Sequence, residues 1–308
     1  MLIITAHRGI LTLPDRKEKS MQKPKVYFTA NITPENVVKL YKLLDIELPG
    51  NIAVKLHSGE TGNQNFLRPE FFKPIIDSVG GTVVECNTAY DGTRNTTEAH
   101  YKTMEAHGWS KLFKVDIMDE TDEMVLPIAG GKRITENYVG EHFKNYDSML
   151  VLSHFKGHPM GGFGGALKNI SIGIASSHGK AHIHGAGDPE KIWTADHDAF
   201  LESMADAAKS IMDALPGRIA FINVMKNMSV DCDCCSVPED PKIGDIGILA
   251  SLDPVAIDKA CVDLVYASQD PGKADLIKRM ESRNGNHTVY AAAALGVGSM
   301  EYELIEVE

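Results

Sequence analysis

The chain has 308 residues, of which 43% are hydrophobic, and its formal net charge is −11 at pH 7. This acidic balance argues against nonspecific nucleic-acid binding, which needs clustered lysine and arginine, and no apolar run is long enough to cross a bilayer. The first residues lack the pattern of a secretory signal, and five cysteines, an odd number, do not resemble a secreted disulfide framework. We therefore expect a cytoplasmic protein with no membrane or nucleic-acid partner.

The first part of the chain predicts alternating strands and helices. Thr33 and Pro34 are residue types that begin helices, and an apolar stripe with helical spacing follows them. A second helix is predicted over residues 69–79, and strands are predicted over residues 25–30, 51–56 and 82–85. This strand–helix–strand–helix–strand order is typical of an α/β domain with a mainly parallel sheet.

The rest of the chain continues the pattern. Residues 197–215 predict the clearest helix, because apolar residues recur there at helical spacing. Further helices are expected over residues 97–107 and 254–265, and strands over 114–118, 123–127, 147–152, 218–225 and 246–250. We expect an α/β protein of two lobes, with mainly parallel sheets flanked by helices and the site in the cleft between the lobes. The expected divisions are a flexible N-terminal extension over residues 1–22, a first lobe over 23–140 and a second lobe over 141–308.

A glycine-rich loop follows the apolar strand that ends at Leu152. It is expected to bring backbone close to a ligand, because glycine has no side chain to prevent that approach. Its spacing matches neither the dinucleotide fingerprint nor the P-loop, so a phosphate cradle and a tight packing turn both remain open. The candidate cofactor-binding positions in it are Gly161, Gly162, Gly164 and Gly165.

The same region is rich in histidine. Five of the twelve histidines of the chain lie within about thirty residues, and imidazole is the commonest metal ligand. We take His154, His182 and His184 as candidate metal ligands. His182 and His184 alternate around Ile183, so on a strand both rings would face one side.

A second candidate metal segment is Asp231-Cys232-Asp233-Cys234-Cys235. Thiolates are soft ligands for transition metals and iron–sulfur clusters, and we take Cys232, Cys234 and Cys235 as candidate ligands. The spacing is not that of a zinc ribbon, so a further ligand must come from elsewhere in the chain. The two neighbouring carboxylates are expected to raise the thiol pKa values. The alternative is a buried cysteine cluster with only a structural role.

Two loops follow predicted strands at the sheet edge where ligands bind in α/β proteins. His57, after the second strand, is a candidate cofactor-binding residue. Arg94, after the third strand, is a candidate site residue that could anchor a carboxylate or phosphate through its guanidinium. Either loop can equally be a polar connection.

Three segments together resemble the domain-of-unknown-function family 362: LSHFKGHPMGGFGGALKNISIGIAS, VDCDCC and DIGILASLDPVAID. Proteins of that family often occur fused or adjacent to ferredoxin-type iron–sulfur modules, so the resemblance implies an iron–sulfur cluster or another transition metal. This chain has no C-x-x-C-x-x-C module, which leaves the compact cysteine cluster as the place for it.

His158 and Lys168 lie ten residues apart, with an aromatic-Gly-Gly sequence between them. This pattern is more distantly similar to the active-site stretch of the nickel-pincer lactate racemases. The resemblance implies that His158 is catalytic, that Lys168 holds a nickel-pincer-type cofactor covalently and that His184 ligates the nickel. The family's second catalytic histidine belongs in a Thr-Gly-Thr-His turn, and Arg94 stands at that place here. The resemblance thus implies a related fold with altered chemistry.

Three functions follow from these patterns. The first is a metal-binding protein with a redox role, acting with a redox partner protein or on a small-molecule substrate. The second is an isomerase or racemase-like enzyme that acts on a small carboxylic acid through a lysine-linked metal cofactor. The third is a non-catalytic module in which the cysteines and histidines only stabilise the fold. The pattern does not indicate an oligomeric state.

Overall fold

The computed structural model describes residues 23–308. The predicted extension over residues 1–22 lies outside the described residues. Two 3₁₀ helices, η1 (Glu141–Asn145) and η2 (Pro189–Lys191), accompany the regular elements. These elements are, in chain order, β1 (Lys25–Thr29), α1 (Pro34–Leu43), β2 (Ile52–Lys55), α2 (Pro69–Val79), β3 (Thr82–Glu85), α3 (Thr97–Ala106), α4 (Trp109–Leu112), β4 (Val115–Ile117), β5 (Glu123–Pro127), β6 (Glu136–Gly140), β7 (Ser148–His154), β8 (Lys156–His158), β9 (Gly162–Gly164), α5 (Ala166–Ser171), α6 (Ser177–His184), α7 (His197–Ala214), β10 (Ile219–Met225), β11 (Gly247–Ser251), α8 (Pro254–Ala267), α9 (Lys273–Ser282), α10 (Asn286–Ala294) and β12 (Glu303–Glu306).

One eight-stranded sheet forms the centre of the molecule, in the order β12-β1-β11-β10-β7-β2-β3-β4. All neighbours in it are parallel except β11, which runs antiparallel to both β1 and β10. The expected α/β class with a mainly parallel sheet flanked by helices is therefore confirmed. Two lobes are not shown, because strands from both sides of residue 140 pair within this one sheet.

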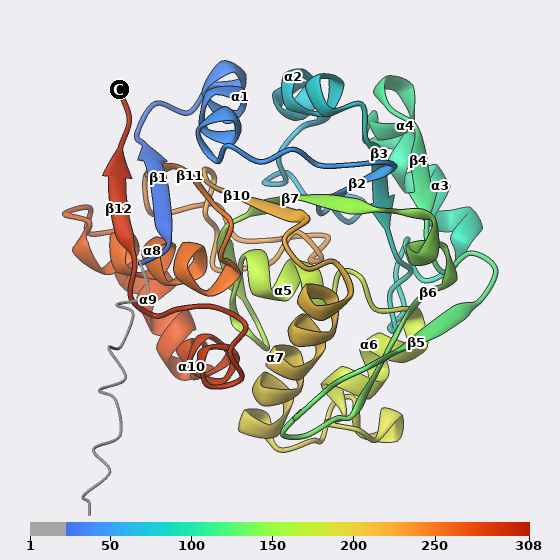
Figure 1. Ribbon diagram of the computed structural model, residues 1–308. Coiled ribbons are helices and arrows are strands. Elements are labelled where there is room, and N and C mark those ends of the chain that lie inside the picture. Colours follow the sequence, from blue (N-terminus) through green and yellow to red (C-terminus); the bar gives the residue numbers. More distant parts are fainter. Residues whose placement is uncertain (1–22) are drawn as a thin grey trace, which may run out of the picture.

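Helices cover both faces of the sheet (Figure 1). The side chains of β7 alternate between these faces, as strand geometry requires. Met149 and Val151 pack in the core under α5, α7 and α8. Leu150 and Leu152 pack in the core on the opposite face, under α1, α2 and α4. Burial on both faces explains why this strand is a continuous apolar run in the sequence.

Side-chain caps fix where several helices begin. The Thr33 hydroxyl accepts a hydrogen bond from the Asn36 amide at 3.2 Å, which confirms the predicted start of α1. Asp253 accepts from two backbone amides at the start of α8. Gly80, with φ of 67°, ends α2 in the left-handed conformation that favours glycine.

No helix within residues 23–308 has the length and apolar character that crossing a bilayer requires.

The segment that carries His182 and His184 differs from the prediction. It is the helix α6, and the Ser176 hydroxyl caps it by accepting from the Gly179 amide at 2.9 Å. Residues two apart on a helix are separated by about 200° around its axis, since each residue turns the helix by about 100°. The interpretation that both rings face one side was therefore wrong, because it assumed a strand.

Candidate functional site

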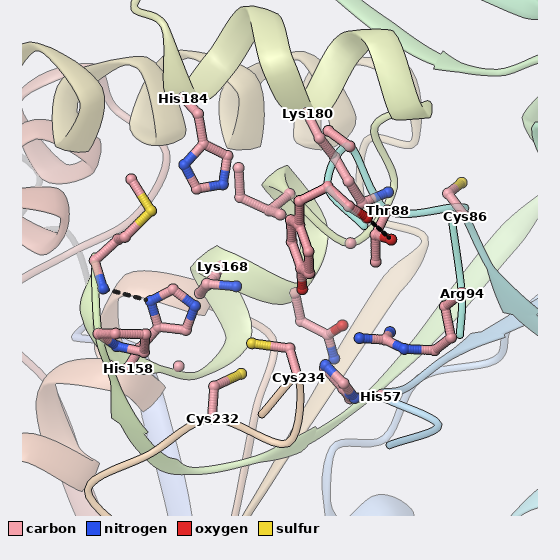
Figure 2. Close-up of a pocket in the computed structure, with 18 of the residues that line it drawn as sticks. His57, Cys86, Thr88, Arg94, His158, Lys168, Lys180, His184, Cys232 and Cys234 are labelled. Carbon is pink, nitrogen blue, oxygen red and sulfur yellow. Dashed lines mark hydrogen bonds between the residues drawn. The ribbon is translucent and has the colours of Figure 1, made fainter. Parts of the chain in front are cut away.

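A cavity of about 330 Å³ lies at the carboxyl ends of three parallel strands. His57 follows β2, Tyr90 and Arg94 follow β3, and His154 ends β7, and all four line this cavity. The carboxyl edge of a parallel sheet is where ligands bind in α/β folds. The two loops that the sequence singles out and the glycine-rich loop thus meet around one cavity (Figure 2).

Two cysteines and one histidine converge in this cavity. One ligand atom each from His158, Cys232 and Cys234 lies within 4.8 Å of the other two. Figure 2 shows the two sulfur atoms and the His158 ring on the same side of the cavity. Two thiolates and an imidazole form a donor set that suits a soft or borderline transition metal. Cys235 lines the same cavity but does not belong to this group.

Backbone amides orient the His158 ring. Its Nδ1 atom accepts hydrogen bonds from the amides of Met160 at 3.1 Å and Gly161 at 2.9 Å. The ring proton of neutral His158 is therefore on Nε2, which can donate to Cys232. Burial, followed by Lys168, lowers the pKa of His158 to about 4. A ring nitrogen ligates a metal only when it carries no proton, so ligation through Nε2 would require this proton to leave that atom.

The cysteine segment is held by buried polar contacts. The Asn63 amide group donates to the Cys235 carbonyl at 2.8 Å, and the Glu60 amide donates to the Asp233 carbonyl at 2.8 Å. The Asp233 carboxylate is bonded to His154 Nδ1 at 2.9 Å and to Lys156 Nζ at 3.0 Å. His154 also contacts the Lys226 carbonyl at 2.6 Å through Nε2. Both ring nitrogens of His154 are thus engaged with oxygen atoms, and the ring positions Asp233.

The predicted effect of these carboxylates on the thiols was wrong for Cys232. Its pKa is well below the ordinary value, because Cys234 hydrogen-bonds to it and Lys156 and His158 lie near. The Asp233 carboxylate is compensated by His154 and Lys156 and does not oppose the thiolate. The second thiol behaves oppositely: the hydrogen bond with Cys232 and burial raise the pKa of Cys234. The two thiols thus titrate as a pair, of which Cys232 ionises more readily.

Five cationic side chains line the cavity, and three of them have a buried carboxylate partner: Lys55 with Glu85 at 2.7 Å, Arg94 with Glu60 at 3.1 Å and Lys156 with Asp233 at 3.0 Å. Within residues 23–308, no carboxylate pairs with Lys168 or Lys180. The Lys180 ammonium donates to the Ala175 carbonyl at 2.6 Å. Burial lowers the pKa of both lysines. The two lysines without a carboxylate partner are therefore the groups of the cavity that are available to an incoming anion.

The other predicted histidines lie in different surroundings. His184 lines the cavity, stacks on Phe200 with ring centroids 4.5 Å apart, and its buried Nδ1 has no partner in the described chain. Burial, followed by Lys168, lowers its pKa well below the ordinary value, so the ring is neutral and able to ligate. His182 packs edge-on against Tyr138 and does not line the cavity. His57 lines the cavity, and its Nδ1 accepts from the Gly59 amide at 3.0 Å.

The four glycines of the loop have separate places. Gly164 and Gly165 line the cavity, and the Gly161 amide orients His158. Gly162 has φ of +77°, and a Cβ there would lie 2.7 Å from the Gly285 Cα, so it permits close packing. The first amides of α5, from Ala166 and Leu167, donate to the Asp258 carboxylate at 2.7 and 2.9 Å. This helix start is thus already occupied by an anion of the protein itself.

Several lining residues were missed from the sequence. Lys55 lies inside a predicted strand, where its apolar neighbours gave no sign of a buried ion pair. Lys180 lies on α6, a helix that was not predicted. Tyr90 and Trp193 come from connecting segments whose composition is ordinary. The rule that ligands bind at the carboxyl edge of the sheet selected the loop that carries Tyr90 and Arg94, but it did not single out Tyr90.

The chain matches the family described as "Domain of unknown function (DUF362)" over residues 52–263. No match is found among curated proteins. One similar solved structure is the lactate racemase apoprotein from Thermoanaerobacterium thermosaccharolyticum, at 16% identity and a TM-score of 0.39, covering 64% of this chain and 50% of that one. Another is a protein from Thermotoga maritima, at 13% identity and a TM-score of 0.44, covering 85% of this chain and 59% of that one. The chain thus spans between half and three fifths of the length of these two proteins.

Proposed function

We propose that this chain, which belongs to the DUF362 family, is a metal-dependent enzyme that acts on a small organic anion. The observation that carries the proposal is the convergence of Cys232, Cys234 and His158 on one side of a cationic cavity. Three protein ligands with a cavity beside them are the arrangement of catalytic metal sites, which keep one coordination position open. Such an ion supplies Lewis-acid or redox chemistry to a bound substrate.

The donor set favours a single ion over an iron–sulfur cluster. Clusters are typically held by four cysteine thiolates, whereas this group has two sulfur atoms and one nitrogen atom. The low pKa of Cys232 supports metal binding, because the ligating form of cysteine is the thiolate. The residues around the ion have different roles. Asp233, which is bonded to His154 and Lys156, holds the cysteine segment in place. Lys168 lines the cavity and can bind the anion through its ammonium group.

Metal analysis of the full chain, purified without oxygen, tests this proposal. We expect about one equivalent of a transition metal in the natural protein, and its loss in the C232S and C234S variants. The matched control is C235S, which changes a neighbouring thiol outside the ligand group and is expected to keep the metal. Metal-free natural protein would overturn the proposal. Equal amounts of iron and sulfide, lost also in C235S, would replace the single ion by a cluster.

A second candidate is an enzyme with a lysine-linked metal cofactor, and a specific observation favours it. Lys168 has no carboxylate partner in the described chain, and His184 faces the same cavity with an unpartnered buried Nδ1. A covalently held cofactor would be bonded to Lys168, and its metal would bind the Nδ1 atom of His184. The residues fit this group in part, because Arg94 replaces the second catalytic histidine of the racemase pattern.

Intact-mass measurement separates the two candidates. The full chain is coexpressed with the proteins that synthesise the pincer cofactor, and the peptide containing Lys168 is sequenced by mass spectrometry. A mass increase on Lys168 that persists in the K180R control supports the second candidate. Loss of the mass increase in K180R would show that Lys180 is the modified residue. Recovery of the unmodified chain alone rejects it and leaves the thiolate-bound ion.

A further inference from the structure

Besides its charged groups, the cavity has a set of apolar and aromatic lining residues. They are Tyr90, Pro159, Met160, Ile172, Ile192 and Trp193. Trp193 is 65% exposed, although most large aromatic side chains of a folded protein are buried. Its ring centroid lies 6.3 Å from that of Tyr90. An exposed indole beside a second aromatic ring at a cavity is a surface on which a flat apolar group can pack.

Tyr90 lines the cavity together with Cys232 and Cys234, and its ring lies beside that of Trp193. Burial raises the pKa of the Tyr90 hydroxyl, and so does the neighbouring Cys234. Lys168 lines the same cavity.

The cavity is larger than a two- or three-carbon acid requires. An apolar cavity of about 150 Å³ is enough to bind one benzene molecule, and this cavity measures about 330 Å³. A phenyl ring and a short chain with a carboxylate therefore fit together. The volume also lies within the range of pockets that enclose most of an organic ligand.

We propose that the substrate is an aromatic carboxylic acid whose carboxylate is held by Lys168 and whose ring packs against the aromatic pair of Tyr90 and Trp193. This inference rests on the proposed function in placing the reacting end of the substrate beside the metal ligands. It goes further by making Trp193 the residue that selects aromatic over aliphatic acids. The recognition combines one ammonium–carboxylate pair with aromatic packing at the other end of the ligand.

Binding of two probe acids to the metal-loaded full chain tests the inference. The probes are 3-phenylpropanoate and propanoate, which share the carboxylate and differ by the ring. The chain has two tryptophans; Trp109 is fully buried, so a ligand-dependent change in emission reports on Trp193. Calorimetry supplies the dissociation constants. We expect about tenfold tighter binding of the phenyl acid.

Variants locate the selectivity. W193A is expected to bring the ratio of the two dissociation constants close to one, and W193F to keep most of it, because phenylalanine retains an aromatic face. Y290A is the matched control, since Tyr290 is an exposed aromatic residue that does not line this cavity. It should leave the ratio unchanged. Both Trp193 variants change an exposed side chain, so their thermal unfolding should match that of the natural protein.

The outcomes separate this inference from the proposed function. Equal affinities for the two acids in the natural protein, or an unchanged ratio in W193A, would reject the aromatic substrate while the metal content still supports the metal site. If the natural protein contains no metal but still binds the phenyl acid more tightly than propanoate, the metal-dependent enzyme is rejected and the aromatic binding site is supported.

Discussion

The two sides of the cavity differ in how their polar groups are satisfied. On the side of the cysteine segment, the Asp233 carboxylate is bonded to both His154 and Lys156. In contrast, Lys168 and Lys180 line the cavity without a carboxylate partner in the described chain. Figure 2 shows the sulfur atoms of Cys232 and Cys234 and the Lys168 side chain near the His158 ring, and the Lys180 side chain away from them. The first side is a preorganised ligand set, and the second is a place for a negative charge that the protein does not itself provide.

This difference explains why one cavity contains both soft thiols and ammonium groups. A thiolate-bound divalent ion compensates the charge of its own ligands, so it does not neutralise the lysines. A carboxylate substrate neutralises them, and its binding is favoured by burial beside an ammonium group that has no carboxylate partner. The two sides therefore predict separate effects: changes on the cysteine side alter metal content and stability, and changes on the lysine side alter anion binding.

The largest effect is expected from D233N, which breaks the cysteine side. It leaves Lys156 and His154 buried without their carboxylate, and breaking a buried ion pair in this way costs about 3–5 kcal/mol of folding free energy. Metal content should fall as well, because the segment of Cys232 and Cys234 loses its support. Chemical denaturation and metal analysis measure the two effects.

The control for that variant is D231N. Asp231 contacts Arg279 at 3.4 Å and lies closer to solvent than Asp233, so its loss should cost less than about 1 kcal/mol. If D233N is as stable as D231N and holds as much metal, the buried carboxylate does not organise the site.

A smaller effect is expected from K168M, which breaks the lysine side. Removing the ammonium group should weaken propanoate binding about tenfold, the size of one charge-assisted hydrogen bond, while the metal content stays the same. K180M is the matched comparison, because that ammonium group already donates to the Ala175 carbonyl. Calorimetry should show less loss for K180M than for K168M. Equal losses would mean that the two lysines form a single anion site.

The sequence predicted most of the fold because its signals are local. The apolar runs gave β3 and β5 with their observed limits, and the cap at Thr33 gave the start of α1. The strand order is not local, and β1 lies between β11 and β12 rather than beside β2. Because β1 comes from the start of the chain and its neighbours β11 and β12 come from the end, the sheet is not divided at residue 140.

The candidate site was predicted in part for a related reason. Parallel strands end at one edge, so the loops of His57 and Arg94 were expected to lie near a site there, and the structure places His158 in the same cavity. The partners of buried charges come from distant residues and leave no local pattern. Asp233 therefore suggested a raised thiol pKa, whereas the structure shows its carboxylate bonded to His154 and Lys156.

The smallest effect on the cavity and its ligands is expected from a change at Glu202, which lies outside the cavity. Its carboxylate is bonded to three basic side chains. It is bonded to Lys132 at 2.7 Å, to Arg133 at 2.5 Å and to His287 at 2.8 Å. Although burial opposes ionisation, these groups lower the pKa of Glu202 to about 2. The folded chain thus binds fewer protons than the unfolded chain between about pH 2 and 4.5, so this stabilisation is present above pH 4.5 and is lost as the pH falls toward 2.

The variant E202Q removes this titration. At pH 7 it should lower the free energy of unfolding by up to about 3 kcal/mol, the stabilisation that corresponds to a pKa lowered from 4.5 to about 2, and between pH 5 and 3 its stability should fall less steeply than that of the natural protein. Denaturation at several pH values measures both slopes. Metal content and propanoate affinity should not change, because Glu202 does not line the cavity. A parallel loss of stability with pH in both proteins would show that the acid sensitivity comes from other carboxylates, and the paired acids beside the cavity, Glu60 and Glu85, would then be the groups to change next.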